Sequence, residues 1–230
     1  MPGDSVLDMG PSNMSNLISV DQVSVTFEGT TLLAPVSFGV DAGQALAVTG
    51  ANGTGKTTLL RVLAGLTRPS GGAVAVDGVG PDERRREFRA LVAALIGVPP
   101  LARNLMVREH LVLVAASWGF SVADAEKRAD QLLVDFGIAA LSLRFPHELS
   151  SGQTQLFSLA LTLARRFQVL LLDEPEQRLD TERQQLVGRA LRGLVDAGRT
   201  LVLSSHSPAL VEHVADRIVH LRDPEYAQSA

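Results

Sequence analysis

Residues 45–58 read ALAVTGANGTGKTT, and they carry the strongest structural signal in the chain. A short apolar run typical of a buried strand ends at Gly50, and from Lys56 onward apolar residues recur at helical spacing. Between them lies the spacing G-x-x-x-x-G-K-T, in the strand-to-helix context of a phosphate-binding loop. Glycines let backbone N–H groups turn toward phosphate oxygens, and the helix N-terminus adds partial positive charge. The stretch therefore predicts a nucleotide-binding site.

The polar side chains of this loop have separate expected roles. Lys56 is expected to reach the β- and γ-phosphates of ATP, and the Thr57 hydroxyl to ligate Mg²⁺. Thr58 offers a second hydroxyl to phosphate. The alternative is a glycine-rich turn with an exposed lysine, which the flanking strand and helix disfavour. The other loop residues expected to contact the nucleotide are Gly50, Asn52, Gly53, Thr54 and Gly55.

Two further groups of candidate residues follow buried strands. The run VLLLDEP at 169–175 places an acidic pair where a parallel sheet gathers its ligands. Asp173 is expected to hold Mg²⁺, and Glu174 to polarise a water for attack on the γ-phosphate. His206 follows the run TLVLSS, whose strand is expected to lie near that of Glu174, so its ring can contact the γ-phosphate and this water. The open alternatives are a strand-ending turn for the pair and a structural histidine.

Strand and helix patterns alternate at both ends of the chain. This alternation predicts an α/β protein with a P-loop NTPase core and a mostly parallel sheet. Strand-like patterns over 17–50 predict an antiparallel β subdomain near the N-terminus, and a mostly helical pattern predicts a helical subdomain inserted over about 85–160. Residues 1–16 are small, polar and proline-bearing, so we expect a disordered extension there and one ATPase domain over 17–230.

Composition restricts the class of protein. The 230 residues carry a net charge of −4, which argues against binding to nucleic acid through bulk charge. The chain has no cysteine, so disulfides and thiolate metal sites are excluded, which fits a reducing compartment. No apolar run approaches the roughly 18 residues that span a bilayer. We therefore expect an ordinary globular protein without a nucleic-acid partner.

Six segments occur in the order that they have in ATP-binding-cassette (ABC) ATPases. They are Phe27, the loop at 50–58, LSSGQ at 149–153, VLLLDEP at 169–175, RLD at 178–180 and SSH at 204–206. From about residue 17 to its end, the chain resembles the nucleotide-binding subunit of an ABC transporter. The phosphate loop alone would fit several NTPase families, whereas LSSGQ upstream of VLLLDEP is highly specific.

The LSSGQ signature has a defined role in that family. The resemblance implies that it binds the γ-phosphate of the nucleotide held by a partner subunit, so that two subunits sandwich two ATP molecules. The residue types agree with this role, because a serine N-cap and a glutamine at capping-box spacing begin a helix whose N-terminus attracts anions. The alternative is a well-capped core helix that merely packs. The residues concerned are Ser150, Ser151, Gly152 and Gln153.

Two more residues take their expected roles from the resemblance. Phe27 would stack on adenine, a contact open to any aromatic face, and its alternative is a strand position in the core. Asp180 would lie in the D-loop, the segment that links the two nucleotide sites across the dimer. Both residues are therefore expected to contribute to nucleotide binding.

Four positions depart from the family pattern. Gly97 stands where a glutamine usually reaches Mg²⁺ and senses the membrane subunit, and a glycine side chain cannot coordinate a metal. Ser151 replaces a commoner glycine. Gln177 and Arg178 replace a small pair, so extra bulk is expected in the dimer interface. None of these changes removes a residue needed for ATP binding.

The resemblance implies ATP hydrolysis that powers a separately encoded transmembrane permease. Two copies of the chain would close on ATP with Mg²⁺ as the cofactor, on the cytoplasmic face of the cell membrane, and export is favoured over import. Two alternatives stay open. One is a soluble ABC-type ATPase outside transport, and the other is a regulatory subunit of low turnover, which the missing glutamine at Gly97 motivates.

Overall fold

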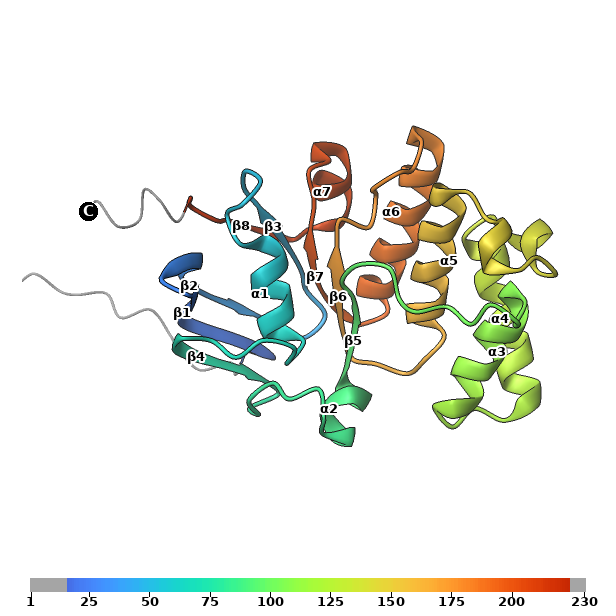
Figure 1. Cartoon of the computed structure of the whole chain (residues 1–230), viewed down its shortest axis with the longest axis horizontal. Helices are drawn as coiled ribbons and strands as arrows, with labels where there is room; N and C mark the ends of the chain where they lie inside the picture. The colour runs from blue at the N-terminus through green and yellow to red at the C-terminus, as the bar shows by residue number, and fades with distance from the viewer. Residues whose placement is uncertain (1–15, 224–230) are drawn as a thin grey trace, which may run out of the picture.

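A computed structural model describes residues 16–223 of the chain (Figure 1). The extension expected over 1–16 lies outside the described residues except for Asn16. Two sheets and seven α-helices form the described part, as the α/β class predicts. In that part, no helix combines the length and the apolar character needed to cross a membrane.

The central sheet has five parallel strands in the order β5-β6-β7-β3-β8. Their side chains alternate between two apolar clusters, since neighbouring residues of a strand point to opposite faces. Burial on both faces explains the continuous apolar runs in the sequence. The strands are β5 (Val92–Leu95), β6 (Val169–Asp173), β7 (Thr200–Ser204), β3 (Ala45–Thr49) and β8 (Arg217–His220).

The second sheet is antiparallel and has the order β2-β1-β4. It consists of β1 (Ile18–Phe27), β2 (Thr30–Val40) and β4 (Gly71–Val76), so the predicted antiparallel subdomain is present. α1 (Lys56–Leu63) contacts β2 and β4 of this sheet and also β6 and β7 of the central sheet. The helix that begins in the glycine loop is thus fixed between the two sheets.

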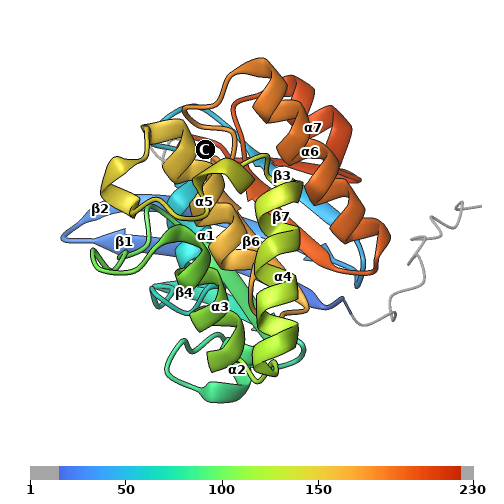
Figure 2. The ribbon, with the colours of Figure 1, turned by 90° about the vertical axis from the view of Figure 1, so that its right-hand side faces the viewer.

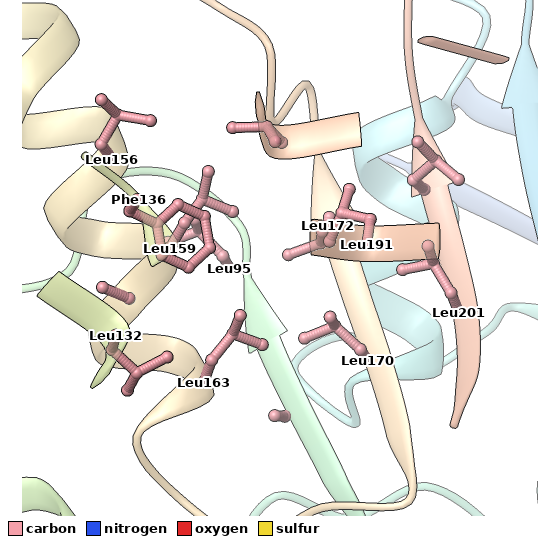
Figure 3. Close-up of a cluster of buried hydrophobic side chains, with 14 of the residues drawn as sticks. Leu95, Leu132, Phe136, Leu156, Leu159, Leu163, Leu170, Leu172, Leu191 and Leu201 are labelled. Carbon is pink, nitrogen blue, oxygen red and sulfur yellow. The ribbon is translucent and has the colours of Figure 1, made fainter. Parts of the chain in front are cut away.

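The opposite face of the central sheet is covered by three helices, α5 (Ser151–Leu163), α6 (Thr181–Asp196) and α7 (Pro208–Val214). Figure 3 shows the leucines of β6 and β7 meeting those of α5 and α6, with Phe136 among them. This packing fixes the start of α5, which carries the signature, relative to the ends of the central strands.

Two helices stand away from the sheet, α3 (Val107–Ser117) and α4 (Val122–Asp135) (Figures 1 and 2). They pack on each other and on α5, and the Arg128 guanidinium of α4 donates hydrogen bonds to the last carbonyls of α5. Two 3₁₀ turns, Ala139–Leu141 and Pro146–Glu148, connect α4 to the signature helix.

The boundary expected for the helical subdomain differs from the structure. The range 85–160 includes α2 (Arg86–Leu91) and then strand β5, which belongs to the central sheet. The sequence VAAL of β5 has no turn residue before it, and alanine is not a strand former. Pairing with β6 makes this segment a strand, and such pairing leaves no local pattern. The helices remote from the sheet therefore begin only at α3.

Candidate nucleotide site

The glycine loop turns directly into α1. Gly55 is the N-cap of α1 with a φ of 95°, and a Cβ at this position would meet the Leu32 carbonyl oxygen at 2.5 Å. Only glycine tolerates both this backbone conformation and this close approach. The loop, the start of β2 and Glu174 line an open cavity of about 730 Å³. Its volume lies in the range of small-molecule and cofactor sites.

Some of the residues expected to bind the nucleotide line this cavity, and others do not. Gly50 and Thr54 do not line it, and Thr54 is buried with its hydroxyl donating to the Ala51 carbonyl. Gly50 and Thr54 therefore belong to the part of the loop that does not face the cavity. The expected residues that line the cavity are Asn52, Gly53, Gly55, Lys56, Thr57, Thr58 and Glu174.

Lys56 is held inside the curve of the loop. Its ammonium donates to the carbonyl oxygens of Gly50 and Ala51, each at 2.9 Å, and the residue is only 6% exposed. An ammonium has three N–H donors and two of them bind these carbonyls, so the third is suited to bind a phosphate oxygen in the cavity that Lys56 lines. The reading of an exposed lysine on a glycine turn is therefore wrong.

Asp173 and Thr57 lie side by side, as their expected metal-binding roles require. The Thr57 hydroxyl donates to Asp173 Oδ2 at 2.7 Å, and the Ser204 hydroxyl donates to Asp173 Oδ1 at 2.5 Å. A carboxylate and a hydroxyl at a phosphate loop are the hard oxygen donors that Mg²⁺ prefers. The donor set therefore fits Mg²⁺. Ser204 was missed because its role depends on the register that pairs it with Asp173.

Glu174 and His206 meet because β6 and β7 are neighbours (Figure 1). His206 Nε2 lies 3.2 Å from Glu174 Oε1. The Gln177 amide donates to the other oxygen, Glu174 Oε2, at 3.0 Å. Both carboxylate oxygens of the expected base are thus engaged by side chains, one from each of two loops. The contact of Gln177 was not predicted, because Gln177 was expected to add bulk to a dimer interface.

The signature forms the predicted capping box. The Ser150 hydroxyl accepts from the Gln153 N–H at 3.3 Å, and the Gln153 side chain accepts from the Ser150 N–H at 2.9 Å. Gly152 is buried, and a Cβ there would meet the Arg178 carbonyl oxygen at 2.8 Å. None of residues 150–153 lines the cavity of its own chain. The exposed start of α5 is therefore no part of the cavity at the phosphate loop of this chain.

The remaining expected residues lie at the edges of the site. Phe27 is 62% exposed at the end of β1, so the alternative of a core strand residue is wrong. Its pairing partner in β2, Thr30, lines the cavity. Asp180 is the N-cap of α6 and accepts from the Arg183 N–H at 2.9 Å. Its carboxylate thus caps the first turn of α6.

Gly97 has a backbone conformation that disfavours the glutamine that ABC ATPases usually have at this position. Its φ is 79°, in the left-handed region, and no neighbouring atom comes within 4 Å of an added Cβ. Space therefore permits a side chain, whereas the backbone of a glutamine would be strained. The glycine and the local backbone of this loop are matched to each other.

Comparisons with known proteins agree with this geometry. The family model described as ABC transporter matches residues 33–177, more than half of the chain. A protein of Brucella suis biovar 1 named as an ABC transporter ATP-binding protein is 36% identical over 213 residues, which are 91% of this chain and 87% of the relative. The macrolide export ATP-binding/permease protein MacB of Neisseria gonorrhoeae is 31% identical over 199 residues. That match covers 84% of this chain but only 31% of MacB.

Solved structures share the fold. The ATP-binding subunit of an ABC transporter superposes with a TM-score of 0.81 at 28% identity, over 90% of this chain and 86% of that chain. A dimeric ATP-binding cassette bound to ADP and phosphate gives a TM-score of 0.80 at 23% identity, over 90% and 94%. Taken with the phosphate loop, the acidic pair and the capped signature, these matches establish that the chain belongs to the ABC transporter family, as an ATP-hydrolysing cassette.

Proposed function

We propose that this chain is the ATP-hydrolysing subunit of an ABC transporter and powers a separately encoded transmembrane permease. Two copies close on two ATP molecules and reopen after hydrolysis, and this cycle drives the permease. The cassette then works at the cytoplasmic face of the membrane, attached through the permease. The name of the relative MacB, a macrolide exporter, favours export over import.

The residues of the site divide the reaction among them. Lys56 binds the phosphates, while Thr57 and Asp173 hold Mg²⁺, which when bound neutralises charge on the phosphate oxygens. Glu174 accepts a proton from the attacking water, and His206 contacts the γ-phosphate beside it. Phe27 stacks on the adenine, and Asp180 links the two sites.

One observation carries the proposed dimer. The signature begins a helix whose first residues, Ser150 and Ser151, are exposed, yet none of residues 150–153 lines the cavity of its own chain. A helix N-terminus attracts anions, and a second copy of the chain brings a γ-phosphate to it. Each copy then completes the site of the other, as an isologous dimer requires.

Mixing two inactive variants tests this arrangement. Lys56→Ala removes the phosphate ligand of one site, and Ser151→Glu places a negative charge at the signature. A glutamate in the first turn of a helix is tolerated, so the fold of α5 should persist while the phosphate is repelled. In an equal mixture half of all dimers pair one variant with the other, and each of these contains one intact site. Phosphate release should therefore recover to about a quarter of the unmodified rate.

The control is Ala123→Glu, which adds the same charge in the exposed first turn of α4 and should leave turnover unchanged. Each single variant should stay nearly inactive at the same total concentration. A mixture no more active than its components, with both variants folded, would refute a signature that acts on the partner's nucleotide.

A second candidate is a cassette whose turnover is restrained. Gln177 and His206 engage both oxygens of Glu174, and Gly97 replaces the usual glutamine. The Gln177 amide occupies Glu174 Oε2, so this oxygen is less open to the attacking water. Gln177 then sets the turnover rate by holding Glu174 at rest.

Gln177→Ala should raise the basal ATP turnover by about fivefold, because one exposed hydrogen bond of about 1 kcal/mol no longer competes for Glu174. Steady-state phosphate release measures the effect. Gln185→Ala, a change of the same kind on α6, is the matched control. A Gln177→Ala variant that turns over more slowly than the unmodified chain would mean that Gln177 assists Glu174 instead of restraining it.

A further inference from the structure

Glu176 is a buried acidic residue that none of the roles described so far involves. It follows Pro175 in the turn after β6 and is only 7% exposed. Its Oε1 accepts three hydrogen bonds, from the Ser205 hydroxyl at 2.5 Å and from the N–H groups of His206 and Ser207 at 3.0 and 3.3 Å. All three donors belong to the loop that carries His206.

Because Glu176 is buried, its carboxylate depends on these three hydrogen bonds. A buried carboxylate is costly unless its oxygens are hydrogen-bonded, and no arginine or lysine among residues 16–223 forms an ion pair with Glu176. The stabilisation comes from the N–H groups just before α7, whose N-cap is Ser207. Glu176 Oε2 is buried without a hydrogen-bond partner in the described part of the chain. Oε1 alone therefore fixes the orientation of the carboxylate.

The hydrogen bonds of the Glu176 carboxylate extend the pairing of β6 and β7 beyond the end of the sheet. The strand register ends at Asp173 and Ser204, and the Glu174 N–H donates to Ser204 at its hydroxyl and its carbonyl. Glu176 then binds the next three residues of the same loop. The backbone of His206 is thus tied to the turn that carries Glu174, and this tie keeps the ring within 3.2 Å of the Glu174 carboxylate.

We propose that Glu176 is a positioning residue for hydrolysis, which holds the His206 loop so that the imidazole faces Glu174 and the γ-phosphate. The proposal rests on the proposed function, in which His206 acts in the reaction. Because Glu176 precedes Gln177 and Asp180 in one short turn, movement of that turn on dimer closure is transmitted to His206. Among residues 16–223 the side-chain hydrogen bonds of Glu176 go to the His206 loop and none goes to the phosphate loop, so its loss should affect kcat and leave the KM for ATP nearly unchanged.

Three variants separate this role from simple stabilisation of α7. Glu176→Ala removes the acceptor, and Glu176→Gln keeps an acceptor oxygen in the same place. Ser207→Ala removes the side-chain cap of α7, in which the hydroxyl accepts from the Leu210 N–H, but keeps the backbone N–H that binds Glu176. The kinetics of phosphate release and the hydrogen exchange of the amides at 205–207 are measured on the full chain for all three.

We expect Glu176→Ala to lower kcat by about tenfold or more with KM within about twofold, because a small misplacement of a reacting group is costly. Glu176→Gln should stay within about threefold of the unmodified kcat, and Ser207→Ala within about twofold. Exchange at His206 and Ser207 should become several-fold faster in Glu176→Ala only.

Two results would overturn the proposal. One is unchanged kcat and unchanged exchange in Glu176→Ala. The other is an equal loss of kcat in Ser207→Ala, which would assign the effect to the stability of α7. If the unmodified chain binds ATP but releases no phosphate, the proposed function fails, and the exchange comparison still decides whether Glu176 holds the loop.

Discussion

Glu174→Gln should reduce ATP turnover by about 10²- to 10⁴-fold, because the amide cannot accept a proton from the attacking water. ATP binding should persist, since the phosphate loop and the Asp173–Thr57 pair are unchanged. An amide oxygen and an amide nitrogen can also keep hydrogen bonds to His206 and Gln177, so the fold of the site should be preserved. Single-turnover phosphate release measures the chemical step directly.

The same variant should accumulate the ATP-bound dimer. If hydrolysis reopens the dimer, the variant should have the mass of two chains in solution with Mg-ATP and of one chain with Mg-ADP. Glu182→Gln, a change of the same kind in the first turn of α6, should hydrolyse ATP normally. A variant that binds ATP and remains a single chain would mean that the cassettes need the permease, or an unlike second cassette, to pair.

Lys56→Ala should weaken ATP binding by about 100-fold and remove measurable turnover. The ammonium donates charge-assisted hydrogen bonds, which contribute about 1.5–3 kcal/mol each, and ATP phosphates can accept at least one of them. Lys56 also binds the carbonyls of Gly50 and Ala51, so the loop itself loses two contacts in the variant. Titration with a fluorescent ATP analogue measures the affinity.

Arg61→Ala is the matched control for this change. It removes one positive charge from the exposed side of the same helix and should leave the affinity for ATP unchanged. Equal losses in the two variants would attribute the effect to net charge or to the stability of α1. Retained affinity in Lys56→Ala would contradict the role of this lysine as the phosphate ligand.

Much of the fold could be predicted because its signals are local. Strands β3, β6 and β7 are buried on both faces and appear as continuous apolar runs, and the glycines before α1 mark the phosphate loop. The capping box is likewise a local signal, because Ser150 and Gln153 are only three residues apart. Because β6 and β7 are parallel, Asp173, Glu174 and His206 lie at the same end of the sheet.

Contacts between segments remote in sequence were decided only by the tertiary structure. β5 and β8 are short edge strands that exist because β6 and β3 offer hydrogen-bonding partners. The bonds of Ser204 to Asp173 and of Glu176 to the His206 loop need the exact register of β6 and β7. The local pattern of apolar residues shows which face of a helix or strand is buried, because side chains on one face recur with the period of that element. The sequence by itself thus determined the family, the core strands and the phosphate site, whereas side-chain partners some 30 residues away were set by packing alone.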